Sequence, residues 1–269
     1  MDIILGVDVG GSTTKIVGLR DGECFGMLQV RAADQITSMY GAIGNFLSNQ
    51  GINLDNVSSV YLTGVGASFI DEQVYGIKTH KVNEFNAIGR GALNLTGLSE
   101  ALVVSMGTGT AFVRATMEEA AHLGGSGVGG GTIVGLASQM LGKSDIDAIL
   151  KLAERGEIKN IDLSVRDILG KEVKSLPSDL TAANFGKVKS TASDSDIALG
   201  IINMVFETVG MLAVFVLKND PIKDVILTGT LATFPQTETV FSKFRELTGV
   251  NFIIPPDAMF ATALGAAMG

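Results

Sequence analysis

Residues 7–15 read VDVGGSTTK, and the architecture of the chain follows from them. An apolar run ends at Asp8, passes the pair Gly10 and Gly11 and continues into a second apolar run, KIVGL. Apolar runs on both sides of a short turn of glycine and hydroxyl residues are typical of a β-hairpin. The same order recurs at residues 104–110, which read VSMGTGT and lead into AFVRA. We therefore expect two β-hairpins of one kind.

A second pair of similar segments follows the two hairpins in the same order. Residues 60–67 read VYLTGVGA and residues 225–232 read VILTGTLA. Such internal similarity is the mark of a duplicated unit, although an LTG triplet after a β-branched run also arises by chance. Because both pairs keep their order, we expect two α/β halves. The second half is longer, and its extra residues fall largely between 131 and 195 as a helical insert.

The insert and the segment after it carry helix signals. Ser144 is expected to cap a helix that reads DIDAILKLAERG. Residues 200–217 form the longest apolar run, interrupted by Asn203, Glu207 and Thr208. A membrane-spanning helix needs about 20 nearly uncharged residues, so this run is expected to be a buried helix.

Composition narrows the classes of function. The 269 residues contain 20 Lys and Arg against 28 Asp and Glu, a net charge of −8, which argues against a nucleic-acid binder. The single cysteine cannot form an internal disulfide. With only two histidines beside it, a cysteine- or histidine-rich metal centre is not expected. Glycine makes up 34 of the 269 residues, a share well above the average of about 7%. Its clusters suggest backbone brought close to a ligand.

Two similar halves predict a cleft between them, and ligands favour such interfaces. Each half supplies one hairpin turn of glycine and hydroxyl residues. Backbone N–H groups of glycine turns bind anions, and Ser and Thr hydroxyls add donors. A chain of phosphates suits a cleft between two such turns.

The motifs together resemble those of type II pantothenate kinases, within the superfamily of actin-like ATPases, Hsp70 and sugar kinases. They run in order along nearly the whole chain: DVGGSTTK at residues 8–15, LTGVGA at 62–67, NEFNA at 83–87, MGTGT at 106–110, GGSGVGGGT at 124–132 and LTAANFG at 180–186. The first motif is shared by the superfamily, and the combination of NEFNA, the triple glycine and the TAANFG segment is more specific.

The resemblance implies a duplicated actin-like α/β fold of the ribonuclease H-like type, with a nucleotide cleft between two lobes. The expected lobes are residues 1–98 and residues 99–269, the second with a helical insert at about 132–195. The implied activity is transfer of a phosphoryl group from ATP to pantothenate, with Mg²⁺, in coenzyme A synthesis. A cytoplasmic homodimer built on the apolar helix at 195–218 is expected, with no membrane or nucleic-acid partner.

Three residues are the expected catalytic group. Asp8 would hold water on Mg²⁺, because a carboxylate facing phosphates needs a cation between them; alternatively it is a turn aspartate. Lys15 would reach a phosphate oxygen as a point charge. Glu84 is the position of the proposed base in the family, although from the residues alone it is also an ordinary first-turn acid with Asn83 as cap.

The resemblance assigns further residues to ATP and to the acceptor. The ATP positions, besides Asp8 and Lys15, are Val9, Gly10, Gly11, Ser12, Thr13, Thr14, Thr108, Gly129, Gly130, Gly131, Thr132, Ile133, Val134, Ile146, Gly229 and Thr230. The acceptor positions are Glu84, Thr108 and His122. For the triple glycine, the physical expectation is a helix start whose N–H groups and positive dipole end point at an anion.

His122 is a departure from the family pattern. The family carries an arginine there, thought to hold the pantothenate carboxylate, and a neutral imidazole cannot make that bidentate clamp. Arg114 or Arg90 would have to compensate, or the acceptor is another small alcohol or sugar. A third possibility is a nucleotide-binding activator ATPase without a small-molecule acceptor.

Overall fold

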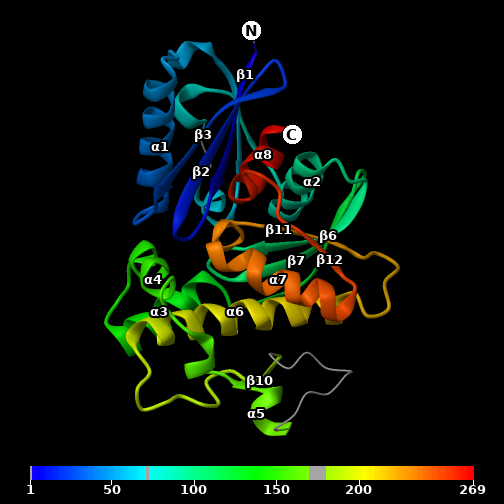
Figure 1. The fold of residues 1–269 in the computed structure, drawn as a ribbon. Helices are drawn as coiled ribbons and strands as arrows, with labels where there is room; N and C mark the ends of the chain where they lie inside the picture. Colours follow the sequence, from blue (N-terminus) through cyan, green and yellow to red (C-terminus); the bar gives the residue numbers. More distant parts are fainter. Residues whose placement is uncertain (1, 71–72, 170–179) are drawn as a thin grey trace.

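The computed structural model describes residues 2–70, 73–169 and 180–269, and its first half is built on a five-stranded sheet (Figure 1). The strands lie in the order β3-β2-β1-β4-β5. Their bounds are β1 Ile3–Val9, β2 Thr13–Arg20, β3 Glu23–Arg31, β4 Val57–Thr63 and β5 Thr79–Lys81. Strands β1, β2 and β3 pair antiparallel, whereas β4 lies parallel to β1 and β5 parallel to β4.

Helix α1, Gln35–Gln50, packs on this sheet. Its start is fixed by Asp34, whose carboxylate accepts a hydrogen bond from the Thr37 N–H at 2.7 Å. It ends at Gly51, which has a φ of 63° in the left-handed region that glycine favours. Its apolar face, including Phe46, closes the core under the sheet. Three short 3₁₀ turns follow in this half: η1 Leu54–Asn56, η2 Val65–Phe69 and η3 Val74–Gly76.

The second sheet repeats the first. Its order is β12-β11-β6-β7-β8, with β6, β7 and β8 antiparallel and β11 and β12 added in parallel. The bounds are β6 Glu100–Met106, β7 Thr110–Thr116, β8 Ala120–Ser126, β11 Asp224–Thr228 and β12 Asn251–Ile253. Both predicted hairpins and both LTG segments therefore occupy matching places, and the duplicated two-lobe α/β fold is confirmed.

The residues at the strand ends pair in the same way in both sheets, so positions in one half can be matched to positions in the other. In the first sheet Asp8 lies opposite Lys15 on β2, and in the second Ser105 lies opposite Ala111 on β7. Asp8 also neighbours Thr63 on the parallel strand, as Ser105 neighbours Thr228. Ser105 is thus the structural counterpart of Asp8.

The described residues between β8 and β11 are largely helical, and residues 170–179 of the expected insert lie outside the described part of the chain. The described segment contains α3 Gly130–Leu141, α4 Ile146–Ala153, η4 Ile158–Asn160, β9 Leu163–Ser164, α5 Val165–Leu169, β10 Thr181–Ala183 and α6 Asp194–Val216. The predicted cap of α4 was wrong by one residue. Asp145 caps the helix, accepting from the Ala148 N–H at 3.0 Å, because the helix begins at Ile146 and Asp145 is the residue directly before it.

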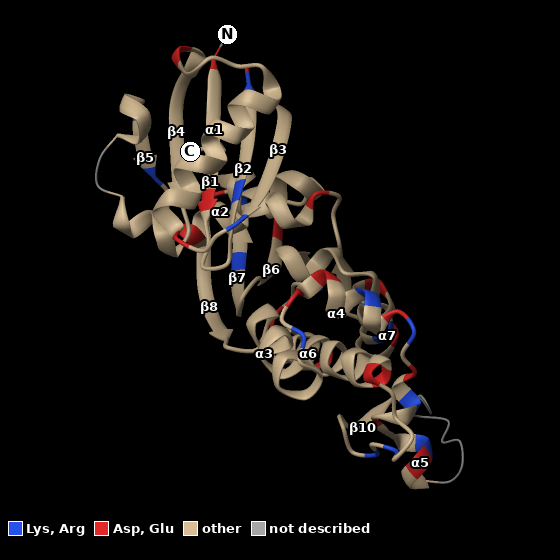
Figure 2. Cartoon of the chain, turned by 90° about the vertical axis from the view of Figure 1, so that its left-hand side faces the viewer, with Lys and Arg blue, Asp and Glu red and all other residues tan. Residues whose placement is uncertain are grey.

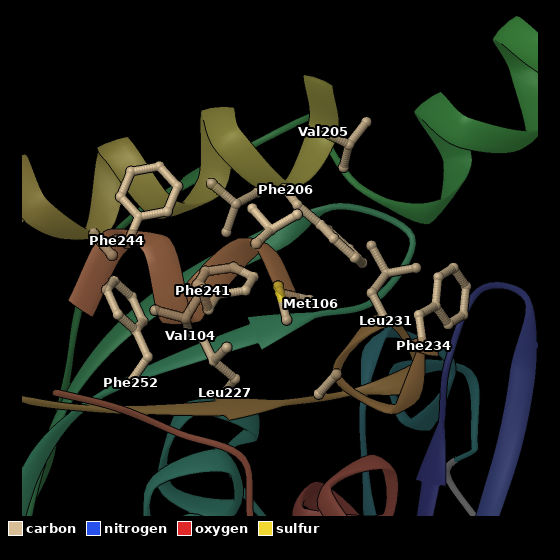
Figure 3. Packing of buried hydrophobic residues seen from close by; sticks show 14 of the residues in the cluster. Val104, Met106, Val205, Phe206, Leu227, Leu231, Phe234, Phe241, Phe244 and Phe252 are labelled. Atoms are coloured by element: carbon tan, nitrogen blue, oxygen red, sulfur yellow. The ribbon is translucent and has the colours of Figure 1, made fainter. Parts of the chain in front are cut away.

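The core of the second lobe lies between its sheet and two helices, α6 and α7 (Pro235–Thr248). Figure 3 shows phenylalanine rings from α6, α7 and β12 meeting over the side chains of β6 and β11. The ring centroids of Phe241 and Phe252 are 5.0 Å apart, and those of Phe206 and Phe241 are 5.9 Å apart. Both pairs are tilted, an arrangement that aromatic rings favour.

Helix α6 is the one helix, within the described part of the chain, that is long and apolar enough to cross a membrane. It packs along α3, α4 and α7, and 44% of its most apolar 18-residue window is buried in this chain. Its exposed end carries Phe215, which is 62% exposed. In the view of Figure 2, acidic and basic residues are interspersed along the elements.

Two helices join the lobes. Helix α2, Glu84–Thr96, follows the first sheet in the sequence but packs on β6, β7 and β8 of the second. Helix α8, Ala261–Ala267, comes after the second sheet but packs on β1, β2 and β4 of the first. Two 3₁₀ turns precede α8 in the sequence, η5 Thr230–Thr233 and η6 Ala258–Phe260. The two helices touch between the sheets (Figure 1). Gly91 and Gly265 lie at the crossing, where an added Cβ would overlap the partner helix backbone at Ala261 or Ala87.

Candidate active site

A cavity of about 1020 Å³ lies between the lobes, at the upper end of the range for small-molecule sites. Both hairpin turns, the first turns of α2, α3 and α4, and the turns η5 and η6 with the start of α8 face it. The lining includes Asp8, Gly10, Gly11, Ser12, Thr13, Lys15, Arg31, Glu84, Phe85, Ile88, Ser105, Gly107, Thr108, Ala111, His122, Gly130, Gly131, Val134, Ser144, Ile146, Gly229, Thr230, Phe234, Met259 and Thr262.

Asp8 and Lys15 form the charged floor of the cavity. Their positions face each other across the antiparallel pair β1–β2, so both side chains leave the same side of the sheet. The Lys15 ammonium is nearly buried and donates to the Thr13 hydroxyl at 3.1 Å. Burial raises the pKa of Asp8, and the positive charge of Lys15 partly offsets that rise. Gly64 gives the carboxylate room, because a Cβ there would lie 2.6 Å from Asp8 Oδ1.

The two hairpin turns meet across the cavity. The Ser12 and Thr108 hydroxyls, one from each lobe, are 2.9 Å apart and share a hydrogen bond. In each turn the first glycine N–H closes the loop, from Gly10 to the Thr13 carbonyl and from Gly107 to the Gly109 carbonyl. The two turns therefore face each other and both line the cavity, as expected from the duplication.

The triple glycine has a different role from the one expected for its N–H groups. The N–H of Gly130 donates to the Gly107 carbonyl and that of Gly131 to the Thr108 carbonyl, both at 2.9 Å. A Cβ on Gly129 would lie 2.7 Å from the Thr108 oxygen. These glycines let α3 pack directly against the second hairpin turn, so two of its first N–H groups brace that turn instead of pointing unpaired into the cavity.

Glu84 lines the same cavity as Asp8. Asn83 caps α2 as predicted, accepting from the N–H groups of Phe85 and Asn86, and so fixes Glu84 in the first turn. Burial raises the pKa of Glu84, the charge of Asp8 raises it further, and His122 lowers it. The two carboxyl groups are thus close enough for their charges to interact.

The wall beside Glu84 is aromatic. The rings of Phe85 and His122 are stacked, with centroids 4.1 Å apart and planes 9° apart. Ile88 and Met259 continue this wall. Arg114, considered above as a substitute for the missing arginine, instead pairs with Asp220 at 2.7 Å. Arg90 donates to the carbonyl of Gly269. The aromatic wall therefore receives no guanidinium from either residue.

Most of the predicted site residues line this one cavity. Those that do not are Val9, Thr14, Gly129, Thr132 and Ile133. Val9, Thr14 and Ile133 are fully buried beneath it. Thr132 accepts from the Gly129 N–H and donates to the Gly127 carbonyl, which shapes the loop before α3.

Sequence reasoning missed several cavity residues. Ser105 could have been found from the duplication, since it aligns with Asp8. Phe85 lies in the NEFNA motif, next to Glu84, and could have been found from it. Arg31, Met259 and Thr262 had no such signal, because only the folded chain brings them to the cleft.

Comparison with known proteins places this site in a family. A family model described as Fumble matches residues 98–243, more than half of the chain. The chain belongs to the Fumble family. The match covers the second hairpin, the triple glycine and α6, so the Fumble segment supplies one wall of the cavity. The resemblance inferred from the motifs is thereby confirmed at the level of the family.

Full-length relatives agree with the Fumble assignment. The chain is 27% identical to a type II pantothenate kinase of Bacillus cereus, over 99% of this chain and 98% of that protein. It is 29% identical to a type II pantothenate kinase of Staphylococcus saprophyticus, over 84% of each.

Solved structures resemble this Fumble chain in fold. An activator of 2-hydroxyisocaproyl-CoA dehydratase from Clostridium difficile, with bound ADPNP, has a TM-score of 0.71 at 14% identity, covering 99% of this chain and 93% of that one. A ROK family glucokinase from Streptomyces griseus, with glucose and AMPPNP, has a TM-score of 0.62 at 14% identity, covering 99% and 98%. At these identities the likeness shows the two-lobe fold alone.

Proposed function

We propose that this protein is a kinase that transfers the γ-phosphoryl group of ATP to the primary hydroxyl of pantothenate, giving 4′-phosphopantothenate in coenzyme A synthesis. The observation that carries the proposal is the single cavity that brings Asp8, Lys15 and Glu84 together between the two hairpin turns. Full-length similarity to proteins named type II pantothenate kinase supports the choice of acceptor.

The residues divide between the two substrates. The phosphate tail lies against the turns at residues 10–13 and 107–109, with Lys15 on a phosphate oxygen. The base and ribose lie toward Val134, Ile146 and Thr230. The acceptor lies along the wall formed by Phe85 and His122, with its hydroxyl next to Glu84. Phosphoryl transfer needs positioning and charge stabilisation more than covalent help.

Glu84 acts as the base in this scheme. Its carboxylate orients the acceptor hydroxyl and takes its proton as the bond from oxygen to phosphorus forms. The proton ends on Glu84, and ADP leaves with the electrons of the broken bond. Lys15 and the hydroxyl groups of Ser12 and Thr108 stabilise the charge on the moving phosphoryl group.

The residues fit a magnesium ion. Mg²⁺ usually keeps several waters and takes one or two carboxylates together with substrate phosphates. Asp8 would hold such a water at the phosphate end, and the described residues contain no group of three or more His, Cys, Asp or Glu side chains that could hold a metal ion. That donor set suits a solvated ion carried with ATP. When bound, the ion would neutralise charge on the phosphates.

An assay of acceptors tests the proposal. Purified protein with MgATP and pantothenate is expected to form ADP and phosphopantothenate in equal amounts. Parallel reactions contain a panel of sugars and small alcohols, and one reaction contains no acceptor. A pantothenate rate no greater than the rate without acceptor would contradict the proposal and favour another alcohol or an activator ATPase.

The pH dependence of turnover follows from the environment of Glu84. A base must be ionised, and burial and Asp8 raise the pKa of Glu84 above its ordinary 4.5. We expect kcat/KM to fall as pH drops through this raised pKa, with a slope of at least one because Asp8, whose pKa burial also raises, must be ionised as well. The acid limb therefore lies above 4.5. An acid limb at or below the ordinary value would show that Glu84 is not the titrating base.

We also propose that the protein acts in the cytoplasm as a homodimer that covers the exposed side of α6. The support is the apolar character of α6 together with the exposure of Phe215 and Val216 near its end. Light scattering after size exclusion is expected to give twice the chain mass of 28.0 kDa. The variant Phe215→Asp should shift the mass toward the monomer, and Ile36→Asp, which changes an exposed apolar residue of α1, should not. A monomeric wild-type protein would contradict the dimer.

A further inference from the structure

The end of β3 carries a second connection between the lobes, at the mouth of the cavity. Arg31 is the last residue of β3 and lies opposite Thr13, so it stands beside the first hairpin turn. Its guanidinium donates to Asp145 Oδ2 at 2.6 Å and approaches Asp147 Oδ2 at 3.4 Å. These carboxylates belong to the start of α4, in the other lobe.

Asp145 has two separate partners. Its Oδ1 accepts the capping hydrogen bond from the Ala148 N–H, and its Oδ2 receives Arg31. The hydrogen bond and charge of Arg31, together with backbone N–H groups, hold the pKa of this carboxyl below its ordinary value, so it is ionised at neutral pH. Ser144 and Ile146, on either side of Asp145, line the cavity.

The backbone next to Arg31 is also held in place. The N–H of the next residue, Ala32, donates to the Ser12 carbonyl at 2.9 Å, and the Ser12 hydroxyl bonds to Thr108 in the other lobe. Two cross-lobe contacts therefore start from the same edge of the first sheet. One lies between the hairpin turns, and the other fixes the helix start that faces the base and ribose in the proposed function.

We propose that Arg31 is a positioning residue for the nucleotide: its ion pair with Asp145 latches the first lobe to the start of α4 and so holds Ser144 and Ile146 against the bound nucleotide. This inference rests on the proposed function for the placement of the base. Neither side chain transfers a proton or contacts the reacting phosphorus. The latch acts by keeping the nucleotide end of the cleft closed.

Binding of ADPNP with Mg²⁺ tests the latch without any acceptor. The variants are Arg31→Gln, Asp145→Asn and the double variant. Asparagine caps a helix as well as aspartate does, so Asp145→Asn removes the ion pair and retains the capping bond. The pair is exposed, with 71% of the Arg31 side chain accessible, and such pairs contribute little. We therefore expect about a two- to fivefold weaker Kd for each single variant.

The double variant decides whether the two residues act through each other. A latch predicts that it binds ADPNP no more weakly than either single variant. It also predicts a raised KM for ATP, an unchanged KM for the acceptor and an unchanged melting temperature. The loss should shrink at high salt, since screening weakens the wild-type pair. Glu154→Gln is the matched control, because Glu154 is an exposed acid at the far end of α4, away from Arg31, and its replacement is expected to leave Kd unchanged.

Three results would overturn the latch. Additive losses in the double variant would mean that the residues act independently. A loss in Arg31→Gln with normal binding in Asp145→Asn would mean that Arg31 contacts the nucleotide directly. Wild-type affinity in all variants would mean that the pair has no role in binding. If the wild-type protein does not bind ADPNP, the proposed function itself is wrong. That result is distinguishable from the three above, in which the wild-type protein binds ADPNP and only the latch fails.

Discussion

Replacing Glu84 with glutamine is expected to lower kcat by about 10²–10⁴-fold, the usual contribution of a general base. Glutamine keeps the size of the side chain and its place in the first turn of α2, and it cannot accept the proton of the acceptor. Affinity for ADPNP is expected to stay within twofold of the wild-type value, because the proposed function places Glu84 beside the acceptor hydroxyl and not beside the nucleotide. Steady-state kinetics and calorimetry measure the two effects.

The same variant should be more stable than the wild type. Burial and the charge of Asp8 raise the pKa of Glu84, so ionising it is costlier in the folded protein than in the unfolded chain. That cost is fully present above the raised pKa and absent below the ordinary value of 4.5. The melting temperature of Glu84→Gln should therefore exceed that of the wild type at pH 7.5 and match it near pH 4.

Glu238→Gln is the control for Glu84→Gln. Glu238 is also a first-turn acid, in α7, but it is exposed and pairs only weakly with Arg245 at 3.7 Å. Its replacement should leave kcat unchanged. If Glu84→Gln turns over as fast as this control, Glu84 is merely a helix-stabilising acid and the proposed mechanism is wrong.

Replacing Gly91 with alanine is expected to destabilise the protein by about 3 kcal/mol, the upper part of the range for overpacking. The new Cβ would overlap the backbone of Ala261 in α8, and backbone cannot move aside as a flexible side chain can. Gly265→Ala should cost as much, since its Cβ would overlap the carbonyl of Ala87 in α2. In a thermal scan the losses should be on the order of 10 °C.

Gly41→Ala provides the matched control within α1. Gly41 is also a helical glycine, and nothing lies within 4 Å of an added Cβ. Here alanine should stabilise by about 0.5–1 kcal/mol, because it lowers the entropy of the unfolded chain and favours the helix. Equal melting temperatures for Gly91→Ala and Gly41→Ala would show that α2 and α8 are not in backbone contact.

The duplicated architecture was predictable because its evidence is local. Each hairpin and each LTG strand can be read within about ten residues, and their order repeats. The register that pairs Asp8 with Lys15 follows from the tight turn alone. The cap on α2 was also predictable, since Asn83 precedes the helix directly. The cap on α4 was not predictable, because Ser144 and Asp145 are both good capping residues. Which of them caps the helix depends on where the first turn begins.

The parts of the site that escaped prediction depend on long-range packing. Arg31 reaches the cavity only because β3 joins the edge of the first sheet and α4 lies opposite. The triple glycine was expected to offer its N–H groups to an anion, as glycines at a helix start often do. Folding instead brings carbonyls of the second hairpin turn within 2.9 Å of two of them, and that competition cannot be seen in the motif.

The matched registers of the two sheets also give the cleft a direction. Where one half presents Asp8 and Lys15, the other presents Ser105 and Ala111, which carry no charge. Copies of one ancestral unit have thus become unlike at the place where they face each other. An elongated ligand with a highly charged tail meets ionic partners on one side only. In the proposed function we therefore expect such a ligand to bind in one orientation, with its charged tail toward Asp8 and Lys15.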